Sequence, residues 1–225
     1  MTITSTTLTK AAGAAAVAAG LAFIGVQVGH PHMDAASIGT TEMGIRTTVK
    51  ILMAMLAVVG LTGMYLRQVT KTGVLGLVGY VVLSAGYLVI MATSLTAGYA
   101  LPAIADTDPD YVNDVIDAST GGSATGDIGL LGTALQVQGV LYLAGGLLFG
   151  IALFRARVLA RWAAALLAVG GLASIALSQM PDAFYRMLAV PNAVAMIGLG
   201  YSLWTVARAT HTPSSEASVV ATAGA

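Results

Sequence analysis

Long apolar segments alternate with short polar ones along almost the whole chain. A helix needs roughly 20 apolar residues to cross the ~30 Å hydrocarbon layer of a membrane. Six segments reach or approach that length, at about 11–29, 48–66, 73–100, 131–154, 158–179 and 183–207. The pattern therefore predicts an all-α, polytopic bundle of six transmembrane helices.

Polar sequence is concentrated in one long connection and at the end of the chain. The connection covers 101–130, and its segment 109–118 has the spacing of a short amphipathic helix. Residues 209–225 are rich in Ser, Thr and Ala, which predicts a disordered tail. The other connections are short, which favours antiparallel neighbours, so residues 1–208 are expected to form a single transmembrane domain.

The composition agrees with a membrane environment. Hydrophobic residues make up 57% of the chain and charged ones 9%, with a mean hydropathy of +0.85. Soluble domains carry about 25% charged residues, so the predicted location is the bacterial cytoplasmic membrane, with membrane lipids as neighbours. The chain has no cysteine, which excludes disulfides and thiolate chemistry. It also lacks an exposed basic cluster, so we expect no nucleic-acid partner.

The basic residues predict the orientation. If the N-terminus is cytoplasmic, seven basic residues fall in the inner segments and three in the outer ones, as the positive-inside rule requires. Acids take no part in that rule, yet nine of the ten then lie outside. We therefore expect both termini in the cytoplasm. The first segment is Ala-rich and follows Lys10, which is also compatible with a signal peptide, but no clear A-x-A cleavage site precedes His30.

Polar side chains of the predicted spans gather at their outer ends. Such groups are costly at membrane depth and usually face the bundle interior. We therefore predict a pocket with a polar mouth at the outer leaflet and an apolar floor. The residues expected to bind a ligand there are His30, His32, Tyr99, Gln136, Gln138, Tyr142, Tyr185 and Asn192.

Three acids are candidates for chemistry at this mouth. Asp34 and Glu42 lie in the stretch HPHMDAASIGTTEMGIR, and Asp182 begins the sixth span. Desolvation would raise the pKa of such a carboxyl, and the protonated form is a usable general acid. The alternative is structural, because Glu42 and Arg46 have the spacing of a simple i,i+4 ion pair, as do Asp182 and Arg186.

Two metal sites can be considered. His30, His32 and Asp34 offer nitrogen and oxygen ligands, but Pro31 constrains them and no second histidine cluster exists. The acidic run DTDPDYVNDVID has oxygen ligands at the spacing of a calcium loop, with Tyr111 where glycine is required. A solvated acidic loop is the preferred interpretation, and we predict neither a metal nor another cofactor.

In size, helix count and its HPHMD stretch after the first span, the sequence resembles small actinobacterial integral membrane proteins, across about residues 10–208. Some of these are bacterial membrane-bound terpene cyclases that make drimentine-type indole sesquiterpenoids. The resemblance implies protonation of a farnesylated, non-diphosphate substrate followed by cation cyclisation. Asp34 or Glu42 would be the acid, Asp182 a second carboxyl, and Tyr99, Tyr142 and Tyr185 would stabilise the cation.

The rival hypothesis is a membrane protein without enzymatic activity. It would bind a lipid or another small molecule, or serve as an accessory subunit of a transporter. The chain has no phosphate-binding glycine loop, no nucleophile elbow and no Asp-rich pair within a helix for binding a diphosphate. Neither energy-coupled transport nor prenyl-diphosphate chemistry therefore has visible machinery. The rival hypothesis predicts ion-paired, solvent-facing acids and no enclosed cavity.

Overall fold

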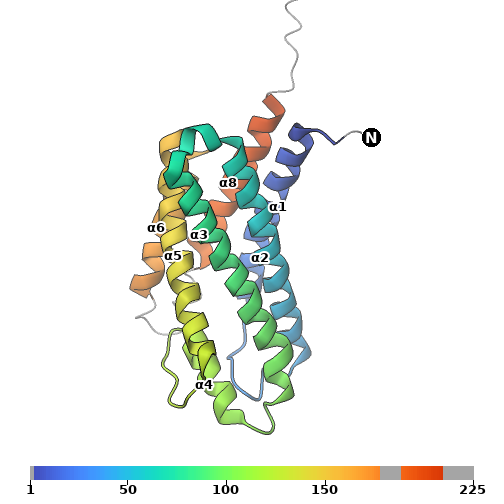
Figure 1. Ribbon diagram of the computed structural model, residues 1–225. Helices are drawn as coiled ribbons and strands as arrows, with labels where there is room; N and C mark the ends of the chain where they lie inside the picture. Colours follow the sequence, from blue (N-terminus) through green and yellow to red (C-terminus); the bar gives the residue numbers. More distant parts are fainter. Residues whose placement is uncertain (1–2, 178–188, 210–225) are drawn as a thin grey trace, which may run out of the picture.

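The computed structural model describes residues 3–177 and 189–209, and the side chains of these except 171–177 and 189. Its regular structure in those ranges is entirely helical (Figure 1). Among the described residues, five helices are long and apolar enough to cross a membrane. The all-α class is thus confirmed, and the helix lengths agree with a membrane bundle. The five helices are α1 (Ser5–Gln27), α2 (Thr41–Arg67), α3 (Val69–Leu95), α5 (Leu130–Ala156) and α8 (Ala189–Ala209), while α6 (Arg161–Leu177) is shorter.

The helix ends differ from the prediction where polar residues are helical. Helix α2 begins seven residues before the predicted span, because the hydroxyl of Thr40 caps it by accepting a bond from the Met43 amide. Helix α3 includes Gly73, whose φ of +58° breaks the regular helix. The predicted start of that span at residue 73 coincides with this break.

The long connection contains the predicted amphipathic helix. After α3 the chain makes a π turn, η1 (Thr96–Ala100), and a 3₁₀ turn, η2 (Leu101–Ala103). Helix α4 (Pro109–Ser119) follows, with the Asp108 carboxylate accepting a bond from the Tyr111 amide and proline in the first turn. Residues 30–40, α4 and 120–130 together form what we call the cap.

The apolar helices pack as a ring in the order α1, α2, α3, α5, α6 and α8, and α8 closes it against α1 (Figure 1). Small residues allow the backbones to approach. On α1, a Cβ added at Gly13 would collide with the Gly200 carbonyl, and one at Gly20 with the Ala193 carbonyl. The Ala- and Gly-rich composition of the first span is therefore explained by its close contact with α8.

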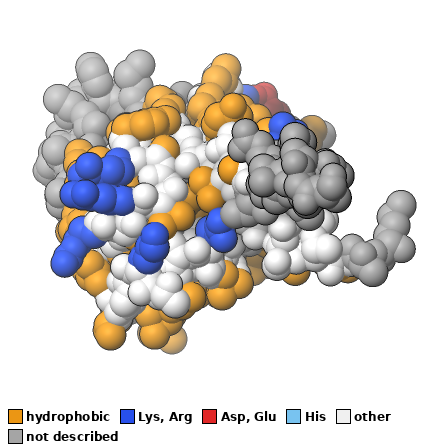
Figure 2. Space-filling model, turned by 90° about the horizontal axis from the view of Figure 1, so that it is seen from above, with side chains coloured by type: hydrophobic (Ala, Val, Ile, Leu, Met, Phe, Trp, Pro, Cys, Tyr) orange, Lys and Arg blue, Asp and Glu red, His pale blue; other side chains and the backbone are white. Residues whose placement is uncertain are grey.

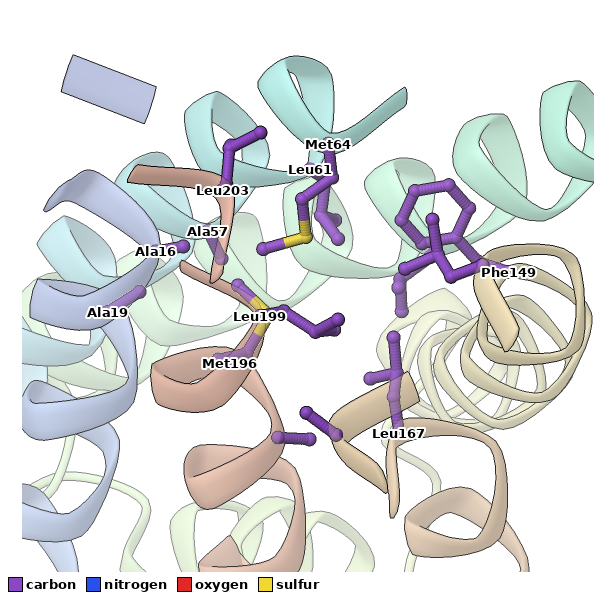
Figure 3. Packing of buried hydrophobic residues seen from close by; sticks show 14 of the residues in the cluster. Ala16, Ala19, Ala57, Leu61, Met64, Phe149, Leu167, Met196, Leu199 and Leu203 are labelled. Carbon is purple, nitrogen blue, oxygen red and sulfur yellow. The ribbon is translucent and has the colours of Figure 1, made fainter. Parts of the chain in front are cut away.

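Two separate hydrophobic cores fill the molecule. The larger lies among the ring helices, with Leu61, Met64, Phe149 and Leu199 fully buried (Figure 3). The smaller lies in the cap, where Val112 and Ile116 of α4 pack with Ile38 of the 30–40 segment. The cap is thus a built structure with apolar packing of its own.

Charge divides between the two ends of the bundle. At the end that carries the start of α1 and the end of α8, Lys and Arg side chains gather (Figure 2). We call this the basic end; it comprises Lys10, Arg67, Lys71, Arg155, Arg157, Arg161 and Arg208. The opposite, acidic end carries the cap, and its acids are Asp34, Glu42, Asp106, Asp108, Asp110, Asp114, Asp117 and Asp127.

Candidate functional site

Arg46 joins the first two helices at the acidic end. Its Nε and Nη2 donate to Oε1 of Glu42, at 2.9 and 2.8 Å. Its Nη1 donates to the carbonyls of Val26 and Val28, at 2.8 and 3.0 Å, and Nη2 donates to Gly29 at 2.9 Å. Arginine has five N–H donors, and the five bonds use all of them. Three of the acceptors are carbonyls at the end of α1, where the helix itself offers no partner.

We call these five hydrogen bonds of Arg46 the helix clamp, and one of the groups that they hold is the carboxylate of Glu42. Its carboxylate forms the i,i+4 ion pair with Arg46 at 2.8 Å, and the Glu42 side chain is 57% exposed. The expectation of a desolvated acid at this position is wrong, because the group faces solvent and a guanidinium. The geometry is the structural alternative that the sequence left open.

Asp34 also differs from a buried general acid. Its Oδ1 accepts a bond of 2.7 Å from the Ser37 amide. That bond, together with a contact to the Ser37 hydroxyl, lowers the pKa of Asp34 below its usual value. Asp34 is therefore a carboxylate that orders the 30–40 segment. The next residue, Ala35, donates its amide to Oδ1 of Asn113 at 2.8 Å and so ties that segment to α4.

The two histidines near the start of the cap have different surroundings. His30 is buried, and its Nδ1 lies 2.9 Å from the carbonyl of Pro31, while His32 is exposed. Within the described ranges, no three His, Asp or Glu side chains are grouped so as to hold a metal ion. The pair therefore does not form a shared site with Asp34.

Of the remaining predicted ligand residues, some lie apart. Tyr99 is 59% exposed, and its hydroxyl lies 2.9 Å from that of Thr48. Its aromatic side chain therefore does not line the space enclosed by the helices. Gln136 is exposed. Gln138 is partly buried and accepts a hydrogen bond from the Thr93 hydroxyl across the α3–α5 contact. Asp182 and Tyr185 lie outside the described residues.

Tyr142 and Asn192, both predicted ligand residues, are brought together from α5 and α8 with a third residue, Tyr87 of α3. The rings of Tyr87 and Tyr142 meet edge to face, with centroids 5.5 Å apart. The hydroxyl of Tyr142 has Tyr87 and Asn192 as neighbours, and Asn192 is 2% exposed. Sequence reasoning did not single out Tyr87 for this cluster, although its place in the middle of an apolar span was a signal.

Two polar atoms of this cluster have no hydrogen-bond partner among the residues described. They are the Tyr142 hydroxyl and Nδ2 of Asn192, and both are buried. An orphaned polar group in a protein interior costs roughly 1–3 kcal/mol. By contrast, the Thr62 and Tyr80 hydroxyls, nearer the basic end, bond to each other at 2.9 Å.

Two hollows open at the acidic end. One, of about 560 Å³, lies between α1 and α2, with apolar walls that include Gly25 and Ile45 and with Glu42 and Arg46 at its edge. The other, of about 370 Å³, lies in the cap beside Asp34, Asp106 and Asn113. Both are open to the outside, unlike the enclosed chamber that a cation cyclisation requires.

Comparison of the chain with models of known protein families, with curated proteins and with solved structures finds no match. Function must therefore be argued from the chain's own residues.

Proposed function

We propose that this protein binds a lipophilic molecule between the helices of its acidic-end half, and that the molecule presents an oxygen to Tyr142 and Asn192. The orphaned Nδ2 of Asn192 carries the proposal. It can only donate a hydrogen bond, and polar groups at membrane depth commonly mark a ligand or ion pathway. A ligand oxygen would supply the missing acceptor. An ordered water is the competing occupant.

The Tyr142–Asn192 cluster is not closed off on the side toward the acidic end, which favours a ligand over a water molecule trapped in the interior. Tyr142 as a residue is only partly buried, and none of α5 between residues 130 and 140 is buried. The apolar core fills the ring toward the basic end. An amphiphile entering from the acidic end would therefore meet polar groups first and the apolar floor last.

The topology belongs to the same proposal. Six spans with both termini in the cytoplasm place the basic end inside, in agreement with the positive-inside rule, and the cap outside. The 17 described residues of α6 extend about 25 Å at 1.5 Å per residue, which is close to the hydrocarbon thickness. The cell membrane is then the site of action, and the ligand is drawn from its outer leaflet.

Binding of tritiated methyl 12-hydroxyoctadecanoate, a neutral chain with a mid-chain hydroxyl, tests the function in detergent-solubilised protein. We expect saturable binding that falls roughly tenfold or more in Tyr142→Phe and Asn192→Leu, the loss of one or two buried hydrogen bonds. Tyr80→Phe is the matched control, since that tyrosine is bonded to Thr62. Absence of saturable binding, or equal binding by folded Tyr142→Phe, Asn192→Leu and wild type, would overturn the proposal.

The terpene cyclase stays a prediction, and Asp34 and Glu42 offer it little support. Protonation of an alkene needs a carboxylic acid, whereas the lowered pKa of Asp34 favours its carboxylate form, and the exposed Glu42 side chain is paired with Arg46. Incubation of the membranes with 3-farnesylindole decides the matter. A cyclised product that is lost in the Asp34→Asn and Glu42→Gln double variant would restore the original assignment, and a product lost only in Asp182→Asn would move the acid to that residue.

A further inference from the structure

Lys50 lies in the half of the bundle nearer the acidic end, and its charge has no partner among the described residues. It falls on the core-facing stripe of α2, three or four residues from the buried Thr47 and Ala54. The residue is partly buried, and in residues 3–177 and 189–209 its amino group has neither an ion pair nor a hydrogen bond. Arg46, one turn away, differs in having every donor occupied. An unpaired cation at membrane depth is costly and marks a candidate binding group.

Other polar side chains lie at the same depth as Lys50. A Cβ on Gly98 of η1, which continues α3, would meet the Thr47 side chain, and this contact sets the register of α2 against η1 and the end of α3. One turn further into the membrane, Lys50 is therefore level with the buried Ser94. The neighbouring Thr93 reaches α5 through its bond to Gln138. We call Lys50, Thr93, Ser94 and Gln138 the polar layer.

The depth of this layer suits a head group of the outer leaflet. Lys50 is nine residues into α2, or about 14 Å along the helix, and about 6 Å further in than Arg46. The Tyr142–Asn192 cluster lies deeper: Tyr142 packs at Gly86 of α3, eight residues from Ser94, or about 12 Å. The extended chain of a long fatty acid covers that separation.

We propose that Lys50 binds the anionic head group of a single-chain amphiphile whose mid-chain oxygen lies at Tyr142 and Asn192, so that the ligand class is an oxygenated long-chain acid. This rests on the proposed function, since it assigns the other end of the same ligand. The carboxylate supplies the counter-charge that Lys50 lacks, and Ser94 and Gln138 offer hydrogen-bonding groups at a similar depth on α3 and α5. No bond is made or broken.

The test compares tritiated 12-hydroxyoctadecanoic acid with its methyl ester at pH 7.5. The wild type should bind the acid at least roughly tenfold more tightly than the ester, as a charge-assisted contact provides. Lys50→Met should remove that preference without weakening the ester, Lys50→Arg should retain it, and Lys71→Met at the basic end should leave it unchanged. Competition by octadecanoic acid and by octadecyl phosphate distinguishes a carboxylate from a phosphate head group.

The outcomes separate the two proposals. Equal binding of acid and ester by the wild type, or a preference that persists in Lys50→Met, overturns the role of Lys50 and leaves the binding function standing; Lys50 would then only extend its amine toward the interface. Failure of both ligands to bind removes the binding function itself.

Discussion

The guanidinium of Arg46 lies 2.8 Å from the carboxylate of Glu42, and the same guanidinium holds three carbonyls at the end of α1. Glu42 thus orients the Arg46 side chain, which donates hydrogen bonds to the carbonyls at the C-terminal end of α1. The pair lies at the edge of the hollow between α1 and α2 and belongs to the framework of the acidic end. A residue pattern that resembles an acid–base site in the sequence is here a helix clamp.

Loss of the clamp should destabilise the fold. Arg46→Gln leaves the carbonyls of Val26, Val28 and Gly29 without charged donors, and we expect the free energy of unfolding to fall by roughly 2–4 kcal/mol. Thermal unfolding in detergent, followed by circular dichroism, measures the change. Arg67→Gln, an exposed arginine at the basic end, should change it by about 0.5 kcal/mol or less. Equal unfolding temperatures for the two variants would contradict the clamp.

The cap should respond to acid through Asp114. This carboxylate accepts bonds from the amides of Thr125 and Gly126, at 2.7 and 2.9 Å, and these lower its pKa below the ordinary 3.8. A lowered pKa in the folded state stabilises the loop above pH 3.8, and this contribution is lost as the pH falls through the folded value. The amide proton shifts of Thr125 and Gly126, followed by NMR, should titrate with a midpoint below 3.8.

Two variants control that titration. Asp114→Asn should abolish it, while Asp117→Asn, an exposed acid on the same helix, should leave it in place. A midpoint at or above 3.8 in the wild type would show that the two amide bonds do not form.

The contact between α3 and α5 should be sensitive to a single methyl group. A Cβ at Gly79 would collide with the backbone of Phe149, whereas one at Gly139 meets nothing within 4 Å. Gly79→Ala should therefore lower the free energy of unfolding by about 1–3 kcal/mol. Gly139→Ala should leave it unchanged or raise it by up to about 1 kcal/mol, because alanine favours the helix. A reversed order of the two variants would mean that the helices pack differently.

The orientation can be read from single cysteines, because the chain has none of its own. Asp110→Cys lies on the exposed surface of α4 and Lys71→Cys on the exposed basic end. In intact cells a membrane-impermeant maleimide should label the first and reach the second only after permeabilisation. The opposite result would invert the topology, and labelling of both from outside would exclude a spanning bundle.

The sequence was sufficient to predict the spans because hydrocarbon length is a local property. The five long apolar helices and α4 lie where the pattern places them, and the separation of acids from bases follows from the alternation of the spans. The gathering of Tyr142 and Asn192 was predicted only as membership of one pocket. Their pairing with Tyr87 depends on the rotation of three helices, which periodicity alone does not fix.

The state of the acids could not be derived from the sequence. The catalytic hypothesis requires a carboxyl between two apolar spans to be desolvated and protonated, and the sequence leaves a structural ion pair open as the alternative. The pKa of Asp34 instead depends on the amide of Ser37, three residues away, in a turn whose dihedral angles no composition specifies. From the sequence, Lys50 enters only as a basic residue at the outer end of the second span. Its three- and four-residue spacing from the buried Thr47 and Ala54 shows that it also lies on the core-facing stripe of α2.

The pairing of α1 with α8 has a consequence for synthesis. Helix α1 leaves the ribosome before α8, and its glycine-lined surface at Gly13 and Gly20 fits the backbone of residues 193–200, so it has no helix partner on that surface until α8 is made. Until then this surface must rest against lipid or against a chaperone of the insertion machinery. The ring of helices can therefore close only after α8 has been translated, and truncation before α8 would leave that surface of α1 unpaired.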